Sequence, residues 1–435
     1  MKVAIIGAGI SGLTAAYYLK ANHEITLYEV AEKIGGHTAT VDIDHLGRRY
    51  AIDTGFIVFN DWTYPNFIEL MDELNVESQP TEMSFSVRCD ATGLEYGGNN
   101  LNTMFAQRRN LLRPSFYTML NDILRFNREA IKDLDSGFIS ASTTLADYLQ
   151  ANGYGHSFIH QYLVPMGCAI WSASTQSMMD FPLLFFVRFF KNHGLLSVND
   201  RPQWRVIKGG SRSYLEPLIS DFKGAIALNS KITSVCRDEK AVRVTLSDGS
   251  VELYDQLIFA CHSDQALALL ADISDEELAA LSAIPYREND VVLHSDESLL
   301  PANKLTWSSW NYWLRKGVQE RPMLTYNMNI LQGLEAPSTF CVSLNATEFI
   351  DPSKIMERFS YSHPVFSLDG IKAADQIQEF NGTNNTWYAG AYLGNGFHED
   401  GVVSGRRVAE AINVMSGMSM TGAGAWIKEV EPVYE

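Results

Sequence analysis

The chain has 435 residues, of which 46% are hydrophobic, so it is long enough for two domains and a large apolar core. Its net charge of −17 argues against a nucleic-acid partner, because phosphate contacts need a basic surface. The five cysteines are scattered without a C-x-x-C pair, which fits a reducing compartment and predicts no metal site; they are Cys89, Cys168, Cys236, Cys261 and Cys341.

The N-terminal apolar stretch runs straight into a glycine-rich turn, so it does not have the form of a signal peptide. No apolar run is long enough to span a bilayer. We therefore expect a cytoplasmic protein, with peripheral contact to the inner membrane left open.

The first thirty residues predict strand, glycine turn, helix, strand and acid. Residues 1–6 form the strand, 13–20 the helix and 24–28 the second strand. The turn between them is G-x-G-x-x-G, made by Gly7, Ala8, Gly9, Ile10, Ser11 and Gly12. The first glycine permits the tight turn, the second lets a pyrophosphate approach the backbone, and the third lets the helix pack closely on the strand. The helix N-terminus offers N–H groups and a positive dipole end to the phosphates.

The acid of this pattern is Glu29, which lies 20 residues past Gly9 and can accept hydrogen bonds from an adenosine ribose. A carboxylate at this position repels a 2′-phosphate, so FAD or NAD fits better than NADP.

A second glycine pair, Gly35-Gly36, follows the acid and leads into His37 and Thr38; an apolar stretch at 50–59 then contains Gly55 and Phe56. Together with the first turn, this resembles the extended FAD signature of the flavin-containing amine oxidase and phytoene-desaturase-like superfamily. The resemblance implies that the loop after the acid covers the pyrophosphate. Relatives often carry Arg where this chain has His37.

The C-terminal part resembles the closing motif of the same superfamily. A strand at 385–392 contains the closing pair Ala389-Gly390, which Ala391 follows where relatives often carry an acid. A glycine-rich turn at 394–401 contains Phe397 and His398, and a helix is expected at 402–415. The resemblance places this turn and helix N-terminus against the flavin ring. Some amine oxidases attach flavin through a Cys near this motif, but the last Cys here is Cys341, so we expect non-covalent FAD.

The middle of the chain is a looser match. Residues 202–211 resemble the return from the substrate domain into the FAD domain. Residues 229–245 alternate like a hairpin, and the resemblance implies backbone contacts to adenine near Ile232.

The expected fold is α/β, a discontinuous Rossmann-type FAD-binding domain with a mixed α+β substrate domain. We assign 1–61, 205–269 and 376–435 to the FAD domain, and 62–204 and 270–375 to the substrate domain. The Gly/Met/Ser-rich tail after Ser416 is expected to wrap or fray.

Two residues are candidates for catalysis. Phe397 matches one of two aromatics that flank the flavin in amine oxidases, where Tyr is common. His398 could move a proton at the flavin, or could simply hydrogen-bond its own loop. No Lys is found on the strand at 290–294, where those enzymes often carry one. Core or interlobe hydrogen bonding is expected for His262 and His294.

Three further features have simple structural alternatives. Glu399 and Asp400 are expected to cap the helix that follows them. The aromatic run at 307–313 predicts a strand beside an apolar or planar substrate, or ordinary core packing. The basic amphipathic stretch at 105–132 and the phenylalanine-rich stretch at 181–190 suit either a lipid surface or buried helices.

Within the superfamily, the nearest likeness is to bacterial predicted NAD/FAD-binding oxidoreductases associated with cyclopropane fatty-acyl synthase-like enzymes. It is seen in the runs at 105–111, 204–205, 309–312, 260–267 and 396–401. Some relatives are thought to dehydrogenate methyl-branched acyl chains on the way to furan fatty acids. This implies FAD-dependent dehydrogenation of an apolar substrate such as a lipid acyl chain. The alternatives are an amine oxidase that releases peroxide and a non-catalytic flavin-binding partner of a lipid-modifying enzyme.

Overall fold

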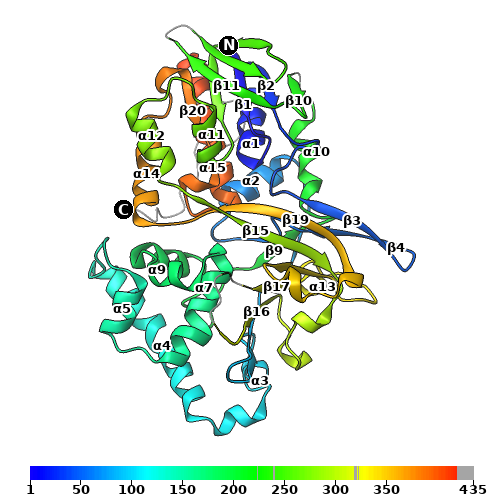
Figure 1. The fold of residues 1–435 in the computed structure, drawn as a ribbon, viewed down its shortest axis with the longest axis vertical. Helices are drawn as coiled ribbons and strands as arrows, with labels where there is room; N and C mark the ends of the chain where they lie inside the picture. Colours follow the sequence, from blue (N-terminus) through cyan, green and yellow to red (C-terminus); the bar gives the residue numbers. More distant parts are fainter. Residues whose placement is uncertain (223, 239–240, 318–320, 322, 419–435) are drawn as a thin grey trace.

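The computed structural model describes residues 1–222, 224–238, 241–317, 321 and 323–418. In the upper half of Figure 1, a parallel five-stranded sheet has the order β10-β2-β1-β14-β20. Its strands are β1 (Lys2–Ile6), β2 (Glu24–Tyr28), β10 (Ala225–Ala227), β14 (Gln256–Phe259) and β20 (Thr386–Tyr388). One sheet is thus built from three separate parts of the chain.

Successive residues of β1 enter two different cores, because side chains alternate across a strand. Val3 and Ile5 pack on one face with helices α1 (Ile10–Leu19), α2 (Pro65–Glu73), α10 (Leu215–Ile219) and α15 (His398–Met415). Ala4 and Ile6 pack on the other face with α11 (Ser263–Leu269), α12 (Asp275–Ser282) and α14 (Leu368–Glu379). Burial on both faces explains why β1 is a continuous apolar run rather than an alternating one.

The antiparallel sheet β11-β12-β13 joins the second of these cores. Its strands are β11 (Ile232–Arg237), β12 (Val242–Leu246) and β13 (Val251–Tyr254). Two smaller sheets stand beside the parallel sheet: β3 (Thr40–His45) pairs with β4 (Arg48–Asp53), and β9 (Trp204–Ile207) lies between β5 (Phe59–Asn60) and β6 (Ser78–Pro80).

A seven-stranded sheet of order β19-β15-β18-β17-β16-β7-β8 begins in the middle of the molecule, where β15 and β19 run across Figure 1. Its pairs are antiparallel except for the parallel pair of β16 and β7. The strands are β7 (Phe85–Cys89), β8 (Leu94–Gly97), β15 (Tyr286–His294), β16 (Trp310–Leu314), β17 (Leu324–Asn327), β18 (Cys341–Leu344) and β19 (Ile355–Pro364). Helix α13 (Met328–Leu331) follows β17 directly.

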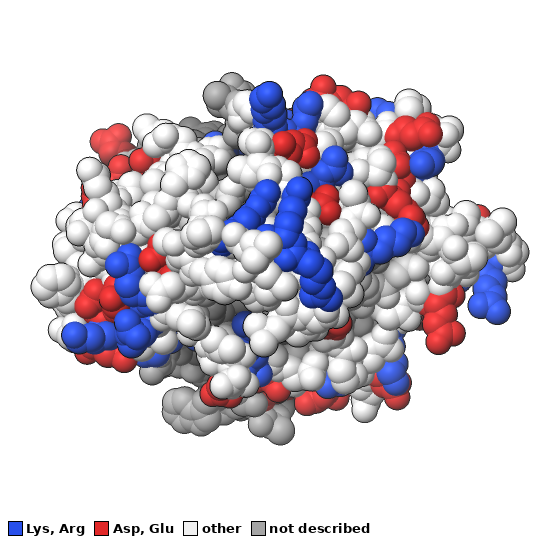
Figure 2. Space-filling model, turned by 90° about the horizontal axis from the view of Figure 1, so that it is seen from below, with Lys and Arg blue, Asp and Glu red and all other residues white. Residues whose placement is uncertain are grey.

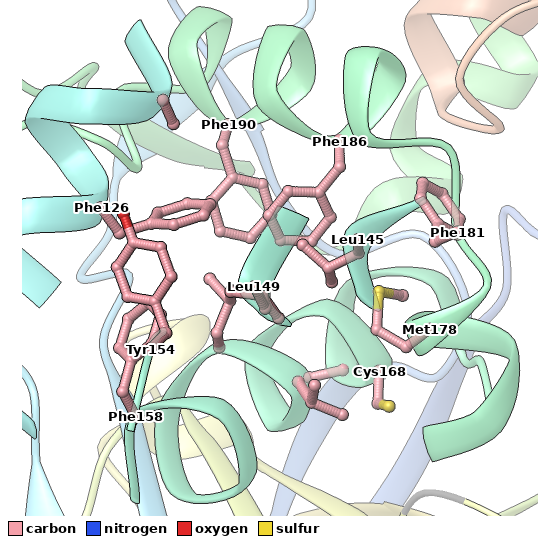
Figure 3. Close-up of a cluster of buried hydrophobic side chains, with 14 of the residues drawn as sticks. Phe126, Leu145, Leu149, Tyr154, Phe158, Cys168, Met178, Phe181, Phe186 and Phe190 are labelled. Carbon is pink, nitrogen blue, oxygen red and sulfur yellow. The ribbon is translucent and has the colours of Figure 1, made fainter. Parts of the chain in front are cut away.

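A helical lobe packs against this sheet in the lower half of Figure 1. It contains α3 (Leu101–Met104), the short 3-10 helix η1 (Arg108–Leu112), α4 (Pro114–Asp135), α5 (Leu145–Ala151), α6 (His156–Phe158), the π-helical turn η2 (Ile159–Leu163), α7 (Val164–Trp171), α8 (Thr175–Met179) and α9 (Leu183–Asn192). Its interior is rich in aromatic rings from several helices (Figure 3). Phe186 and Phe190 of α9 stack at 4.0 Å.

The structure confirms the α/β fold, and the elements at the two ends differ from the expected ones in their bounds. Helix α1 begins at Ile10 rather than at 13, and of the strand expected at 385–392 only β20, Thr386–Tyr388, is a strand, since Ala391–Leu393 forms a 3-10 turn. The final helix begins at His398 rather than at 402, because the Asp400 carboxylate accepts the Phe397 N–H at 2.8 Å and caps a helix that includes the turn. Residues 419–435, which hold most of the tail expected to wrap or fray, lie outside the described residues. The boundaries between the two domains stay a prediction.

Candidate functional site

The first glycine turn lies at the carboxyl end of β1, at the edge where parallel sheets bind ligands. Gly7 has a φ of +107°, and its N–H donates to the Tyr28 carbonyl at 2.9 Å. A Cβ on Gly12 would lie 2.0 Å from the Gly7 carbonyl oxygen. Both glycines are therefore required by the packing of turn, helix and strand.

Gly9 differs, because a Cβ placed on it would meet no atom within 4 Å. This residue is the N-cap of α1, and no side chain caps the helix there. The N–H groups of the first helical turn therefore have no side-chain cap, at the positive end of the helix dipole. A phosphate group fits this cradle.

The second glycine pair lies directly against the first turn. The Gly35 N–H donates to the Ala8 carbonyl at 2.8 Å, and a Cβ on Gly36 would lie 3.2 Å from the Cα of Gly9. The carboxylate of Glu29 accepts the N–H groups of Ala8 and Ala31, each at 2.9 Å. Glu29 thus ties the two loops together, and its contact with a ribose stays a prediction.

His37 lies beneath this loop, where its carbonyl accepts the Phe56 N–H at 2.7 Å. A Cβ on Gly55 would lie only 2.2 Å from the same carbonyl. The ring of His37 is 5.3 Å from the ring of His363 and 6.5 Å from the ring of His262. Burial, and then these two rings, lower the pKa of His37 to about 3.

The His37 Nε2 atom is buried and has no hydrogen-bond partner within the described residues. An unpaired buried polar atom is costly, so a ligand atom that pairs with it would be stabilised. Together with the cradle at Gly9, this nitrogen fits a cofactor that carries a pyrophosphate.

The closing helix α15 packs directly on α1. A Cβ on Gly405 would lie 2.3 Å from the Ser11 carbonyl oxygen, and one on Gly401 would lie 2.6 Å from Ile10. This contact explains why both α15 positions are glycine. It brings the N-terminus of α15 beside the N-terminus of α1.

His398 occupies the first turn of α15 and is held on several sides. Its ring stacks on Phe56 with centroids 3.6 Å apart. Its Nε2 lies 2.8 Å from the Tyr214 hydroxyl and 3.2 Å from the Thr38 hydroxyl, and these two hydroxyls also contact each other. Burial, followed by the proximity of His37, lowers the pKa of His398 well below its usual value. The ring is therefore neutral, and a role in moving a proton stays a prediction.

Glu399 and Asp400 have different roles. Asp400 caps its own helix, as expected. The expectation was wrong for Glu399, whose carboxylate accepts the N–H groups of Asn66 and Phe67 at 2.9 and 2.8 Å, at the start of α2. The fold places α2 across from α15, so the unsatisfied N-terminus of α2 takes this carboxylate. Burial raises the pKa of Glu399 to about 7.

Phe397 connects the two halves of the molecule, because it packs against both the α1–α15 core and the core of the helical lobe. Its ring stacks on Phe189 at 5.1 Å and lies 5.9 Å from His193. Burial lowers the pKa of His193 to about 4, so this neighbour is a neutral ring. The closing turn therefore presents an aromatic, uncharged surface toward the helical lobe.

The remaining predicted cofactor residues lie on the same upper half. The N–H of Gly390 donates to the Ser404 hydroxyl of α15 at 3.0 Å, and Ala391 begins the short turn that leads into that helix. Ile232 begins β11, and the neighbouring Ser230 N–H donates to the Glu29 carbonyl at 2.9 Å. Ile232 thus lies close to Glu29 in the fold, Gly390 and Ala391 lie beside α15, and the contact of Ile232 with adenine stays a prediction.

Sequence reasoning missed Tyr214, His193 and His363. Tyr214 follows the glycine pair 209–210, which is a visible signal, but nothing local shows that it reaches His398. The expected hydrogen bonding is found for His294, whose Nε2 lies 2.8 Å from the Ser343 hydroxyl. The other such candidate, His262, stacks on Tyr286 at 4.2 Å, and its ring lies 6.5 Å from that of His37.

Two of the open alternatives are settled by burial. Helix α9, which contains most of the stretch at 181–190, faces the lobe interior, so it is a core helix. In the aromatic run, Tyr312 is in the same core, while the Trp313 Nε1 donates to Asp90 at 2.9 Å on the opposite face of β16. This run is core packing rather than one continuous pocket wall.

Among the described residues, no group of three or more His, Cys, Asp and Glu side chains is placed to hold a metal ion. In the same part of the chain, no helix has the length and apolar character needed to cross a bilayer.

The fold and the site define a two-domain dinucleotide-binding protein, with one cradle at α1 and a second helix N-terminus closing it. The sequence profile of the flavin containing amine oxidoreductases matches residues 10–309, and the chain belongs to this family. This family consists of flavin-containing oxidoreductases and lies within the amine oxidase and desaturase-like superfamily.

Relatives span several activities. The chain is 25% identical over 265 residues to a probable flavin-containing monoamine oxidase A from Dictyostelium discoideum; the match covers 57% of this chain and only about half (54%) of that protein. Cyclohexylamine oxidase from Brevibacterium oxydans has a similar fold, with a TM-score of 0.68, 15% identity and coverage of 96% of this chain and 99% of that one. A fatty acid isomerase from P. acnes that produces CLA is also similar, with a TM-score of 0.65, 16% identity and coverage of 95% and 98%.

Proposed function

We propose that the flavin is FAD and that it binds without a covalent bond. The open cradle at Gly9 and the unpaired Nε2 of His37 suit the pyrophosphate, and Glu29 suits the adenosine ribose. Cys341, the last cysteine in the chain, begins β18 and is buried there rather than at the closing turn. Denaturation in acid should therefore release all of the flavin, which chromatography of the supernatant measures.

We propose further that the substrate is apolar, such as a lipid acyl chain, and that the reaction is its dehydrogenation. The observation that carries this proposal is the aromatic cluster at the closing turn, where Phe397 packs on the buried ring of Phe189 and lies beside the neutral ring of His193. These uncharged rings give the closing turn an apolar environment, which stabilises a hydrocarbon better than an ammonium group. The fold shared with a fatty acid isomerase is compatible with this substrate class.

FAD, when bound, supplies the acceptor for the hydride that leaves the substrate carbon. The contribution of the protein is positioning and exclusion of water. Phe397 would hold the chain against the closing turn, and the packed rings of the helical lobe would keep the site dry. His398, with its Nε2 fixed by Tyr214 and Thr38, would keep Phe56 in place beneath it.

The test is an anaerobic titration of the purified, FAD-loaded protein with total bacterial lipid. The absorbance of the flavin band is measured after each addition. Bleaching of the band, with an acyl chain two mass units lighter in the product, supports dehydrogenation. A band that stays intact with lipid but bleaches with an amine panel would contradict it.

Amine oxidation is the second candidate, favoured by the match to a probable monoamine oxidase and by the shared fold with cyclohexylamine oxidase. It predicts peroxide release with amines in air and none with lipids. A protein whose flavin is reduced by neither substrate class would act instead as a flavin-binding partner of a lipid-modifying enzyme.

A further inference from the structure

One end of the molecule carries a basic and apolar surface, although the chain as a whole has a net charge of −17. We call it the lower face: it is formed by α3, η1 and the outer side of α4, at the bottom of Figure 1. Figure 2 views the molecule from this end, with several Lys and Arg side chains in the middle of the view beside broad uncharged surface. Residues 105–132 contain six basic residues and two acidic ones.

The two acidic residues of this segment are both engaged by other side chains or backbone groups of the lobe. Asp122 accepts the Gly155 N–H at 2.9 Å, and Glu129 accepts the Tyr154 hydroxyl at 2.8 Å. Both also pair with Arg125, at 3.4 and 3.8 Å. Asp122 is therefore engaged inside the lobe, and Glu129, whose side chain is 35% exposed, is engaged by Tyr154 and Arg125.

The outer arginines stay charged toward solvent. Arg108 and Arg109 are exposed and donate to the backbone carbonyls of Phe105 and Gly93, which leaves their positive charge in place. Arg128 is exposed on α4. Such a cluster attracts an anionic surface.

Apolar side chains lie among these arginines. Leu112 is 88% exposed, and Leu101 and Leu124 are 77% and 57% exposed. Tyr117 lies seven residues before Leu124, so the two share one side of α4, and its hydroxyl donates to the Leu111 carbonyl at 3.1 Å, which joins α4 to η1. Exposed leucines gathered in one place mark an interaction surface.

We propose that the lower face docks on an anionic lipid bilayer. The leucines would enter the boundary between headgroups and acyl chains, while Arg108, Arg109 and Arg128 would contact lipid phosphates. A basic patch on an acidic protein is complementary to an anionic bilayer, and the apolar side chains between the charges distinguish this surface from a purely electrostatic one. The proposal stands on the surface alone and does not depend on the substrate.

The experiment is flotation of the FAD-loaded full chain with vesicles of phosphatidylcholine alone, or of phosphatidylcholine with 30% phosphatidylglycerol, at 50 and 500 mM salt. The variants are R108E/R109E and L111S/L112S. The controls are L253S, an exposed leucine on β13, and R48E on β4, an exposed arginine away from the lower face. Thermal unfolding of every variant, monitored by flavin fluorescence, checks that each variant is folded.

We expect binding to the anionic vesicles at low salt and little binding to the neutral ones. Because each basic residue at such a surface changes affinity by roughly fivefold, R108E/R109E should lower the partition coefficient at least about twentyfold. L111S/L112S should lower it at both salt concentrations, while the controls stay within twofold. No flotation with anionic vesicles at 50 mM salt would overturn the proposal, and so would equal loss in the controls. Retention on heparin without flotation would assign the face to a different polyanion and overturn it as well.

Discussion

The two glycines Gly9 and Gly12 should separate cofactor binding from folding when each is replaced by Ala. At Gly9 the backbone has φ −75° and ψ −177°, which any residue adopts, and the new Cβ would enter open space. At Gly12 the new Cβ would lie 2.0 Å from the Gly7 carbonyl oxygen. We expect the G9A protein to fold and to lose affinity for FAD, and the G12A protein to lose stability even without cofactor.

The magnitudes follow from these contacts. Replacing Gly by Ala at a compatible position stabilises a protein by about 0.4–1 kcal/mol, and Ala is a poorer N-cap than Gly by a similar amount. The free energy of unfolding of the cofactor-free G9A protein should therefore stay within about 1 kcal/mol of the wild type. A methyl group placed where the pyrophosphate approaches costs about 1–3 kcal/mol, which is roughly five- to 150-fold in affinity. G12A must move a helix against a strand and should cost about 3 kcal/mol or more.

The assay has two parts. Urea denaturation of the cofactor-free proteins, followed by circular dichroism, gives the free energies of unfolding. Quenching of FAD fluorescence on addition of protein gives the affinities. If G9A bound FAD within twofold of the wild type, the cradle at Gly9 would not be the pyrophosphate site; if G12A were as stable as the wild type, the packing argument would be wrong.

Three other changes test the surroundings of the site. Tyr214→Phe leaves the buried Nε2 of His398 with Thr38 alone and should cost about 1–3 kcal/mol in urea denaturation; an unchanged midpoint would contradict the network. Arg237→Met leaves Glu277, whose side chain is 5% exposed, without its guanidinium partner and should cost about 3–5 kcal/mol, most of it regained in R237M/E277L; a double variant as unstable as the single one argues against this. The pKa of Glu399 is raised to about 7 in the folded state from 4.5, so its contribution to stability is complete below pH 4.5 and is lost as pH rises through 7. Relative to Glu399→Gln, the wild type should therefore lose up to about 3 kcal/mol between pH 5 and 8, and parallel pH profiles would refute the assignment.

The start of the chain could be predicted closely because its signals are contiguous. A buried strand, three glycines at fixed spacing and an acid all lie within 29 residues, and the structure places β1, α1 and β2 there. The strand of the closing motif could also be predicted from its own residues, although only Thr386–Tyr388 of the expected range 385–392 is a strand. The helix after it begins four residues earlier than expected. The Asp400 carboxylate accepts the Phe397 N–H, so the end of the glycine-rich turn becomes the first turn of the helix.

The contacts of the site could not be predicted, because they join residues far apart in the chain. Glu399 contacts Asn66 across 333 residues, and Tyr214 contacts His398 across 184. The ring group of His37, His262 and His363 comes from three separate segments. A single sequence shows the chemistry of each side chain but not which other segment faces it. For the same reason, the exposure of the lower face became visible only in three dimensions.

The packing of α15 on α1 has a consequence for biosynthesis. The two helices are far apart in the sequence and are therefore translated at different times. Asn22, just after α1, donates a hydrogen bond to Asn413 of α15 at 3.0 Å, and 391 residues separate the two. At ordinary rates of translation the phosphate cradle emerges from the ribosome roughly 20–80 s before the helix that closes it. The first helix must wait with its apolar face uncovered, in a state that chaperones can bind. Flavin retention by a newly made chain would then report that α15 has been made and docked.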